Sequence, residues 1–139
     1  MNKNLKLVLA VLAGLIFWGM LNFASLFGLA MLWPAFGDVG RAAQASNDYS
    51  QFTLPMLIML LAMWTWVNVG AGWLTVFVTK NRNSIWFLIA PLMLFALYNH
   101  AYALWDNLAN WYNIAVIVIF PPTLFLGSLL VKRPKANGP

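Results

Sequence analysis

Residues 53–104 read TLPMLIMLLAMWTWVNVGAGWLTVFVTKNRNSIWFLIAPLMLFALYNHAYAL, two long apolar runs separated by the short polar turn KNRNS at 80–84. Each run reaches the ~20 residues that an α-helix needs to cross the hydrocarbon core of a bilayer. A turn this short joins antiparallel helices. The stretch therefore predicts two transmembrane helices, at about 53–79 and 85–104, packed as antiparallel neighbours.

Two further apolar runs flank this hairpin, at about 5–33 and 111–131. Pro34 is expected to end the first run, because proline cannot continue the helical hydrogen-bond ladder. The polar loop after it is compatible with a short surface helix at 38–46. The chain is 63% hydrophobic and 8% charged, whereas about a quarter of the residues in a soluble domain are charged. The sequence thus predicts an all-α, polytopic membrane protein, with one antiparallel domain of four transmembrane helices over residues 1–139.

The charged residues are divided between the two sides of the predicted spans. Cations flank the termini and the hairpin turn, at Lys3, Lys6, Lys80, Arg82, Lys132, Arg133 and Lys135; the other loops hold Arg41, Asp38, Asp48 and Asp106. By the positive-inside rule, both termini are expected in the cytoplasm, and the protein in the bacterial inner membrane as a multi-pass protein. The net charge of +5 belongs to these short flanks, so no basic face for nucleic acid is expected.

The residue types that usually carry chemistry are scarce. The chain has no cysteine and one histidine, and its few acids are all aspartates. Thiolate metal sites, thiol relays and a bis-histidine haem within one chain are therefore excluded. We expect no cofactor and no metal, and the sequence favours a protein that is not an enzyme.

Small and polar side chains form stripes along two of the predicted helices. Thr65, Asn68 and Gly72 share one face of the second span, and Asn22 and Ser25 lie on a similar face of the first. Such residues let helices approach closely and form hydrogen bonds between them, so we expect these five residues in the packing interface. The alternative is a polar translocation path, although a cation path would normally include a carboxylate at this depth.

A second group of residues is a candidate for ligand binding. Trp64 and Trp66 lie too deep in the second span to belong to an interfacial belt, and an indole at that depth packs against a helix, a lipid tail or a flat ligand. His100, Tyr102 and Asp106 gather near the end of the third span. Together with Asn68 they form the predicted ligand-binding set. His100 and Asp106 are also the only acid–base pair that the chain can assemble locally.

Parts of two spans show a family pattern. The fourth contains NWYNIA at 110–115, FPP at 120–122 and LGSLL at 126–130, and the second contains NVGAGW at 68–73. The chain in this respect resembles small bacterial four-helix integral membrane proteins of uncharacterised function, with an asparagine at 110 where that pattern would have proline. The resemblance implies the architecture and a bacterial inner membrane, and it carries no activity.

We therefore expect a non-enzymatic accessory or structural subunit of the membrane, which binds lipids, a larger membrane complex or copies of itself. Two other hypotheses stay open. One is a small oligomeric transporter or channel for a neutral or lipophilic solute, and the other is an outer-face enzyme that uses His100 and Asp106.

Overall fold

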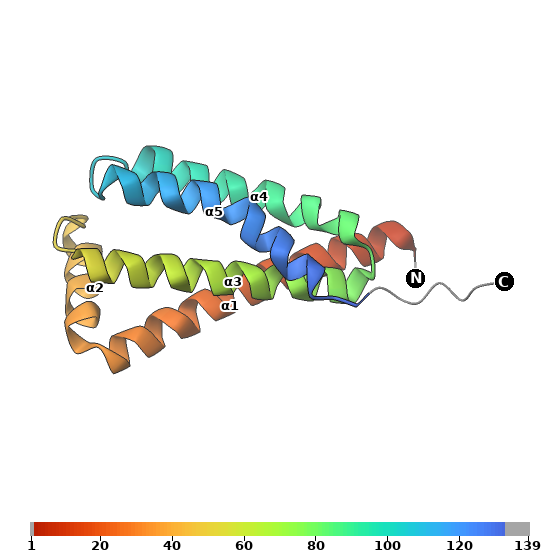
Figure 1. Ribbon diagram of the computed structural model, residues 1–139, viewed down its shortest axis with the longest axis horizontal. Helices are drawn as coiled ribbons and strands as arrows, with labels where there is room; N and C mark the ends of the chain where they lie inside the picture. Colours follow the sequence, from red (N-terminus) through yellow and green to blue (C-terminus); the bar gives the residue numbers. More distant parts are fainter. Residues whose placement is uncertain (1, 133–139) are drawn as a thin grey trace.

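The computed structural model describes residues 2–132, so Arg133 and Lys135 lie outside the described residues. All the regular secondary structure of the described part is helical, as predicted (Figure 1). Its elements are α1 (Lys3–Leu32), α2 (Pro34–Ser46), α3 (Leu54–Thr79), the 3₁₀ turn η1 (Arg82–Ser84), α4 (Ile85–Leu97), the π-helix η2 (Tyr98–Ala103) and α5 (Asn110–Leu129). Within this part of the chain, four helical segments are long and apolar enough to cross a membrane, namely Lys3–Leu32, Leu54–Thr79, Arg82–Ala103 and Asn110–Leu129.

A break at Trp33 separates α1 from α2. Trp33 has φ −133° and ψ 85°, which is not helical, and Pro34 then begins α2 in the first turn, where its missing N–H costs little. The predicted surface helix at 38–46 is thus part of a longer helix that starts at Pro34. Figure 1 shows α2 turned across one end of the bundle, beside the α4–α5 turn and away from the start of α1. We call this the α2 end.

α3 and α4 run antiparallel and contact each other, as predicted, but neither is the other's main neighbour. α3 packs mainly on α5 and α1, whereas α4 lies mainly against α5 (Figure 1). Two glycines explain the α3–α5 contact, because a Cβ at Gly72 would overlap the carbonyl oxygen of Leu124 and a Cβ at Gly127 would overlap that of Val69. The backbones of α3 and α5 can approach each other closely because Gly72 and Gly127 have no side chain.

The α5 helix contains two adjacent prolines, Pro121 and Pro122, and Figure 1 shows that it changes direction part-way along its length. Proline removes a backbone donor and bends a helix in this way. The hydroxyl of Thr123 donates to the carbonyl oxygen of Ile119, 2.6 Å away, and so supplies one of the hydrogen bonds near the bend.

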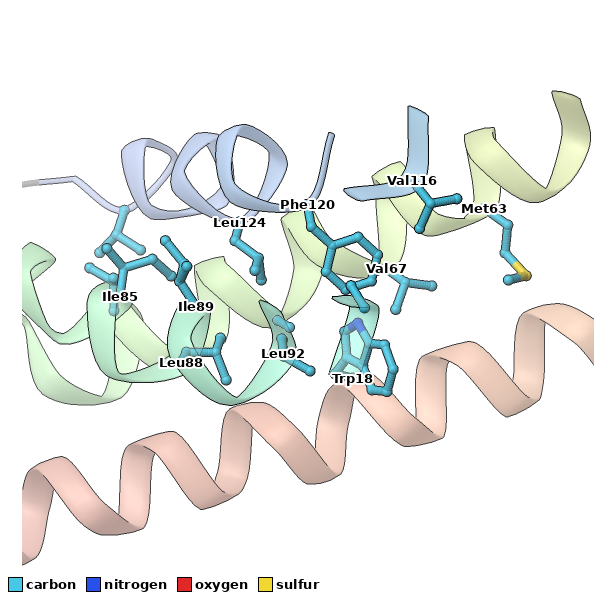
Figure 2. Close-up of a cluster of buried hydrophobic side chains, with 14 of the residues drawn as sticks. Trp18, Met63, Val67, Ile85, Leu88, Ile89, Leu92, Val116, Phe120 and Leu124 are labelled. Atoms are coloured by element: carbon cyan, nitrogen blue, oxygen red, sulfur yellow. The ribbon is translucent and has the colours of Figure 1, made fainter. Parts of the chain in front are cut away.

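A cluster of buried side chains fills the middle of the bundle. In Figure 2, Trp18 from α1 points toward Phe120 from α5, with Val67 from α3 beside them. The ring centroids of Trp18 and Phe120 are 6.3 Å apart in an edge-to-face arrangement. Large apolar side chains also cover the outside, among them Phe23 at 74% exposure, which is the surface that a lipid environment requires.

Candidate functional site

A partly open cavity of about 460 Å³ lies at the α2 end. Residues of α1, α2, α3, α4, η2 and α5 line it, together with residues of the turns that follow α2 and η2. Eight of its lining residues are Phe, Tyr or Trp: Phe23, Phe27, Phe36, Tyr49, Phe52, Trp64, Phe95 and Tyr112. Its size falls within the ~300–1,000 Å³ of small-molecule sites, and its walls are mainly apolar, as such sites usually are.

A few polar side chains join these aromatic walls. Arg41 and Gln44 reach the cavity from α2, and Asn99 and His100 from η2. The Arg41 guanidinium donates to the carboxylate of Asp38 at 2.5 Å, and both side chains are 73% exposed. An exposed pair of this kind adds little stability, so Arg41 is available to other anions.

His100 is enclosed by the cavity wall, at 5% exposure. It lies in the π-helix, where the Leu104 N–H donates to the carbonyl oxygen of Asn99 at 2.7 Å, five residues back. Its Nδ1 is 2.9 Å from Oδ1 of Asn113. π-helical turns recur at functional sites, because they change the direction of the side chains they carry.

The partner of His100 determines its tautomer. The amide nitrogen of Asn113 donates to the carbonyl oxygens of Leu104 at 3.2 Å and Trp105 at 3.4 Å, which fixes the orientation of the amide. The Oδ1 atom then faces His100, and an amide oxygen can only accept. The proton of a neutral His100 is therefore on Nδ1, and Nε2 is an acceptor.

Tyr112 lies beside His100. The two rings are edge to face at 5.8 Å, and Tyr112 is 2% exposed. The indole N–H of Trp64 donates to the Tyr112 hydroxyl oxygen at 3.2 Å. The hydroxyl proton of Tyr112 has no acceptor within residues 2–132, so it remains able to donate.

A second polar cluster lies deeper, between α1, α3 and α5. The indole N–H of Trp18 donates to Oδ1 of Asn68 at 2.9 Å, and Nδ2 of Asn68 donates to the Thr123 hydroxyl at 3.1 Å. Asn68 is fully buried. Both ends of its amide are used in linking three helices, so this cluster is a closed network that holds the bundle together.

The cavity unites two members of the predicted ligand-binding set, Trp64 and His100. Asn68 belongs to the deeper network. Tyr102 is 78% exposed on the outer surface, and its ring contacts Tyr98 with centroids 5.8 Å apart. Asp106 is exposed in the α4–α5 turn, and His100 bonds to Asn113 instead of to this carboxylate.

The other residues of the predicted sets lie along α1 and α3. Trp66 is 51% exposed, and its indole N–H donates to the Ser25 hydroxyl at 3.1 Å, across the α1–α3 contact. The Thr65 hydroxyl donates to the carbonyl oxygen of Leu61 within its own helix. Gly72 lies against the α5 backbone. The Oδ1 atom of Asn22 is buried, with no hydrogen-bond partner among the described residues.

Sequence reasoning missed the roles of Tyr112 and Asn113. A tyrosine close to the end of a predicted span is typical of the interfacial belt, and an asparagine there is typical of a solvated surface, so neither residue type drew attention. Both are instead buried. The available signal was spacing, since Val116 follows Tyr112 by four residues and Asn113 by three, which places it on the same side of the helix as both.

Acidic groups do not build a metal site in the described part of the chain. Residues 2–132 contain no cluster of three or more His, Asp or Glu side chains. Asp48 instead accepts from the backbone N–H of Ser50 at 2.9 Å, and this hydrogen bond holds the pKa of its carboxyl below the ordinary value. Asp48 is therefore ionised at neutral pH.

Comparison of the chain with protein families, with curated proteins and with solved structures found no match. A function for this chain therefore has to be inferred from the geometry of the cavity and of the deeper network.

Proposed function

We propose that this chain is a non-enzymatic, multi-pass protein of the bacterial inner membrane that binds a membrane lipid in the cavity at its α2 end. It would act as an accessory subunit, within a larger membrane complex or in self-association. The observation that carries the proposal is the aromatic cavity of about 460 Å³, with its polar side chains on α2 and η2. An amphiphile can place its chain against the aromatic walls and its head among these polar groups.

The proposal requires the α2 end to face outward, with both termini in the cytoplasm. Because the chain contains no cysteine, single cysteines can report this directly. Ser46→Cys, exposed at the end of α2, is expected to react with a membrane-impermeant maleimide added to intact spheroplasts. Asn83→Cys, in the α3–α4 turn, should react only after the membrane is permeabilised. The reverse pattern would invert the assigned orientation.

Lipid binding is expected to depend on Phe27, whose ring lines the cavity although it is 60% exposed. Phe27→Ala should weaken binding of a phospholipid about tenfold, because a phenyl ring that contacts a ligand contributes on the order of 1–2 kcal/mol. Native mass spectrometry of the purified protein, titrated with a defined phospholipid, measures this loss.

Phe77→Ala is the matched control, because Phe77 on α3 is 46% exposed and does not line this cavity. It removes the same atoms from another part of the surface and should leave lipid affinity unchanged. Equal losses in the two variants would mean that lipid merely coats the bundle, and the cavity would then have no special role.

A further inference from the structure

Two buried hydrogen-bonding groups of the cavity have unused capacity, and they are of opposite kinds. His100 is only 5% exposed, and its Nε2 can accept. The Tyr112 hydroxyl already accepts from Trp64, and its proton can still donate. Within residues 2–132 no group donates to Nε2 of His100 or accepts the Tyr112 hydroxyl proton, so both side chains can still bond to a ligand in the cavity that they line.

A hydroxyl suits either group, because it can donate its proton to Nε2 of His100 or accept from Tyr112 through its lone pairs. A ketone or ester carbonyl can accept from Tyr112 but has nothing to give His100. An ammonium can donate to His100 but cannot accept from Tyr112. The pair therefore favours a hydroxyl over the other head groups that a lipid usually carries.

The walls indicate what bears the hydroxyl. Besides Tyr112, the rings of Trp64 and Phe95 line the cavity, and Phe23 and Phe27 line it on α1. Two aromatic rings in offset or edge-to-face contact stabilise each other by more than the burial of their surface alone would give. A flat aromatic ring in the cavity can make such contacts with several wall residues, whereas a saturated chain is stabilised only by the burial of its apolar surface.

We infer that the cavity at the α2 end binds a hydroxylated aromatic lipid of the hydroquinone type, whose phenolic hydroxyl donates to Nε2 of His100. This inference rests on the proposed function, because it specifies which amphiphile the cavity takes. It involves binding only, with no transfer of electrons. The reduced, hydroxyl-bearing form of such a lipid should bind more tightly than its oxidised, carbonyl-bearing form.

The test uses the full chain in lipid nanodiscs and isothermal titration calorimetry under anaerobic conditions. Four probes share one alkyl chain: an alkyl hydroquinone, the corresponding benzoquinone, the hydroquinone dimethyl ether and an aliphatic alcohol. The hydroquinone is expected to bind about tenfold tighter than each of the others, because each lacks either the hydroxyl or the ring. Equal affinities for the hydroquinone and its dimethyl ether would refute the hydrogen bond from the hydroxyl. Equal affinities for the hydroquinone and the alcohol would refute recognition of the aromatic ring.

The variant His100→Asn tests whether the hydroxyl of the ligand bonds to Nε2 of His100. An asparagine amide can replace Nδ1 in the bond to Asn113, so the fold is retained, while the acceptor at the Nε2 position is lost. In this variant the hydroquinone and its dimethyl ether should bind within about twofold of each other. Tyr102→Phe, on the exposed surface, should keep the full preference. A preference that survives His100→Asn would refute the role of His100.

The two proposals fail in different ways. If phospholipid binds and Phe27→Ala weakens it, but no ring probe binds, this inference falls and the proposed function stands. If neither phospholipid nor any probe binds, both fall. Thermal unfolding of each variant, followed by circular dichroism, separates loss of the site from loss of the fold.

Discussion

Gly72→Ala and Gly127→Ala are each expected to destabilise the bundle by about 3 kcal/mol, the upper end of the usual cost of overpacking. The added Cβ would overlap a backbone carbonyl oxygen of the opposite helix, that of Leu124 for Gly72 and that of Val69 for Gly127. A side chain can move to another rotamer, but a helix backbone cannot. α3 and α5 would have to separate along their main contact.

Thermal unfolding in detergent, or titration with sodium dodecyl sulfate followed by circular dichroism, measures this loss. Gly19→Ala and Gly28→Ala are the matched controls, since a Cβ at either position meets no atom within 4 Å. Replacing glycine by alanine inside a helix stabilises it by roughly 0.5–1 kcal/mol, so the controls should change stability in the opposite direction. If Gly72→Ala behaved like Gly19→Ala, α3 and α5 would not be in close backbone contact.

The fold was predictable to the level of helices but not to the level of their pairing. Length and hydropathy determine which segments are helical, and Pro34 and the KNRNS turn set two of the boundaries. Pairing depends on surface shape. Gly72 was on the predicted packing stripe, but nothing in the sequence links it to Gly127, because any two small-residue faces are compatible partners.

The candidate site was predictable only in part, for a related reason. Trp64 was chosen because an indole is unusual deep in a span, and His100 because it forms, with Asp106, the only local acid–base pair in the sequence. Which groups they meet depends on a π-helical turn that shifts the register of η2, and on α2 turning across the bundle end. Neither feature has a sequence pattern of its own. Asn113 therefore gave no sign of its contact with His100.

Asn68→Leu is expected to destabilise the bundle by about 2 kcal/mol, somewhat above the usual effect of one hydrogen bond between membrane helices. The change leaves the Trp18 indole N–H without an acceptor in the core and removes a link to Thr123. Asn22→Leu is the matched comparison from the same predicted seam. Its Oδ1 is buried without a partner among the described residues, so its loss should be neutral or stabilising.

The contrast between these two asparagines also separates packing from transport. If they line a translocation path, leucine at either position should change solute flux in liposomes more than it changes stability. If they serve packing, Asn68→Leu should lower stability, and a double-mutant cycle with Trp18→Phe should give a coupling of about 1 kcal/mol, because the two residues share one hydrogen bond. A zero coupling would mean that the network seen between α1 and α3 contributes nothing. The full burial of Asn68, with both ends of its amide engaged, favours packing, since a residue on a solute path needs a hydrogen-bonding group free to meet the solute.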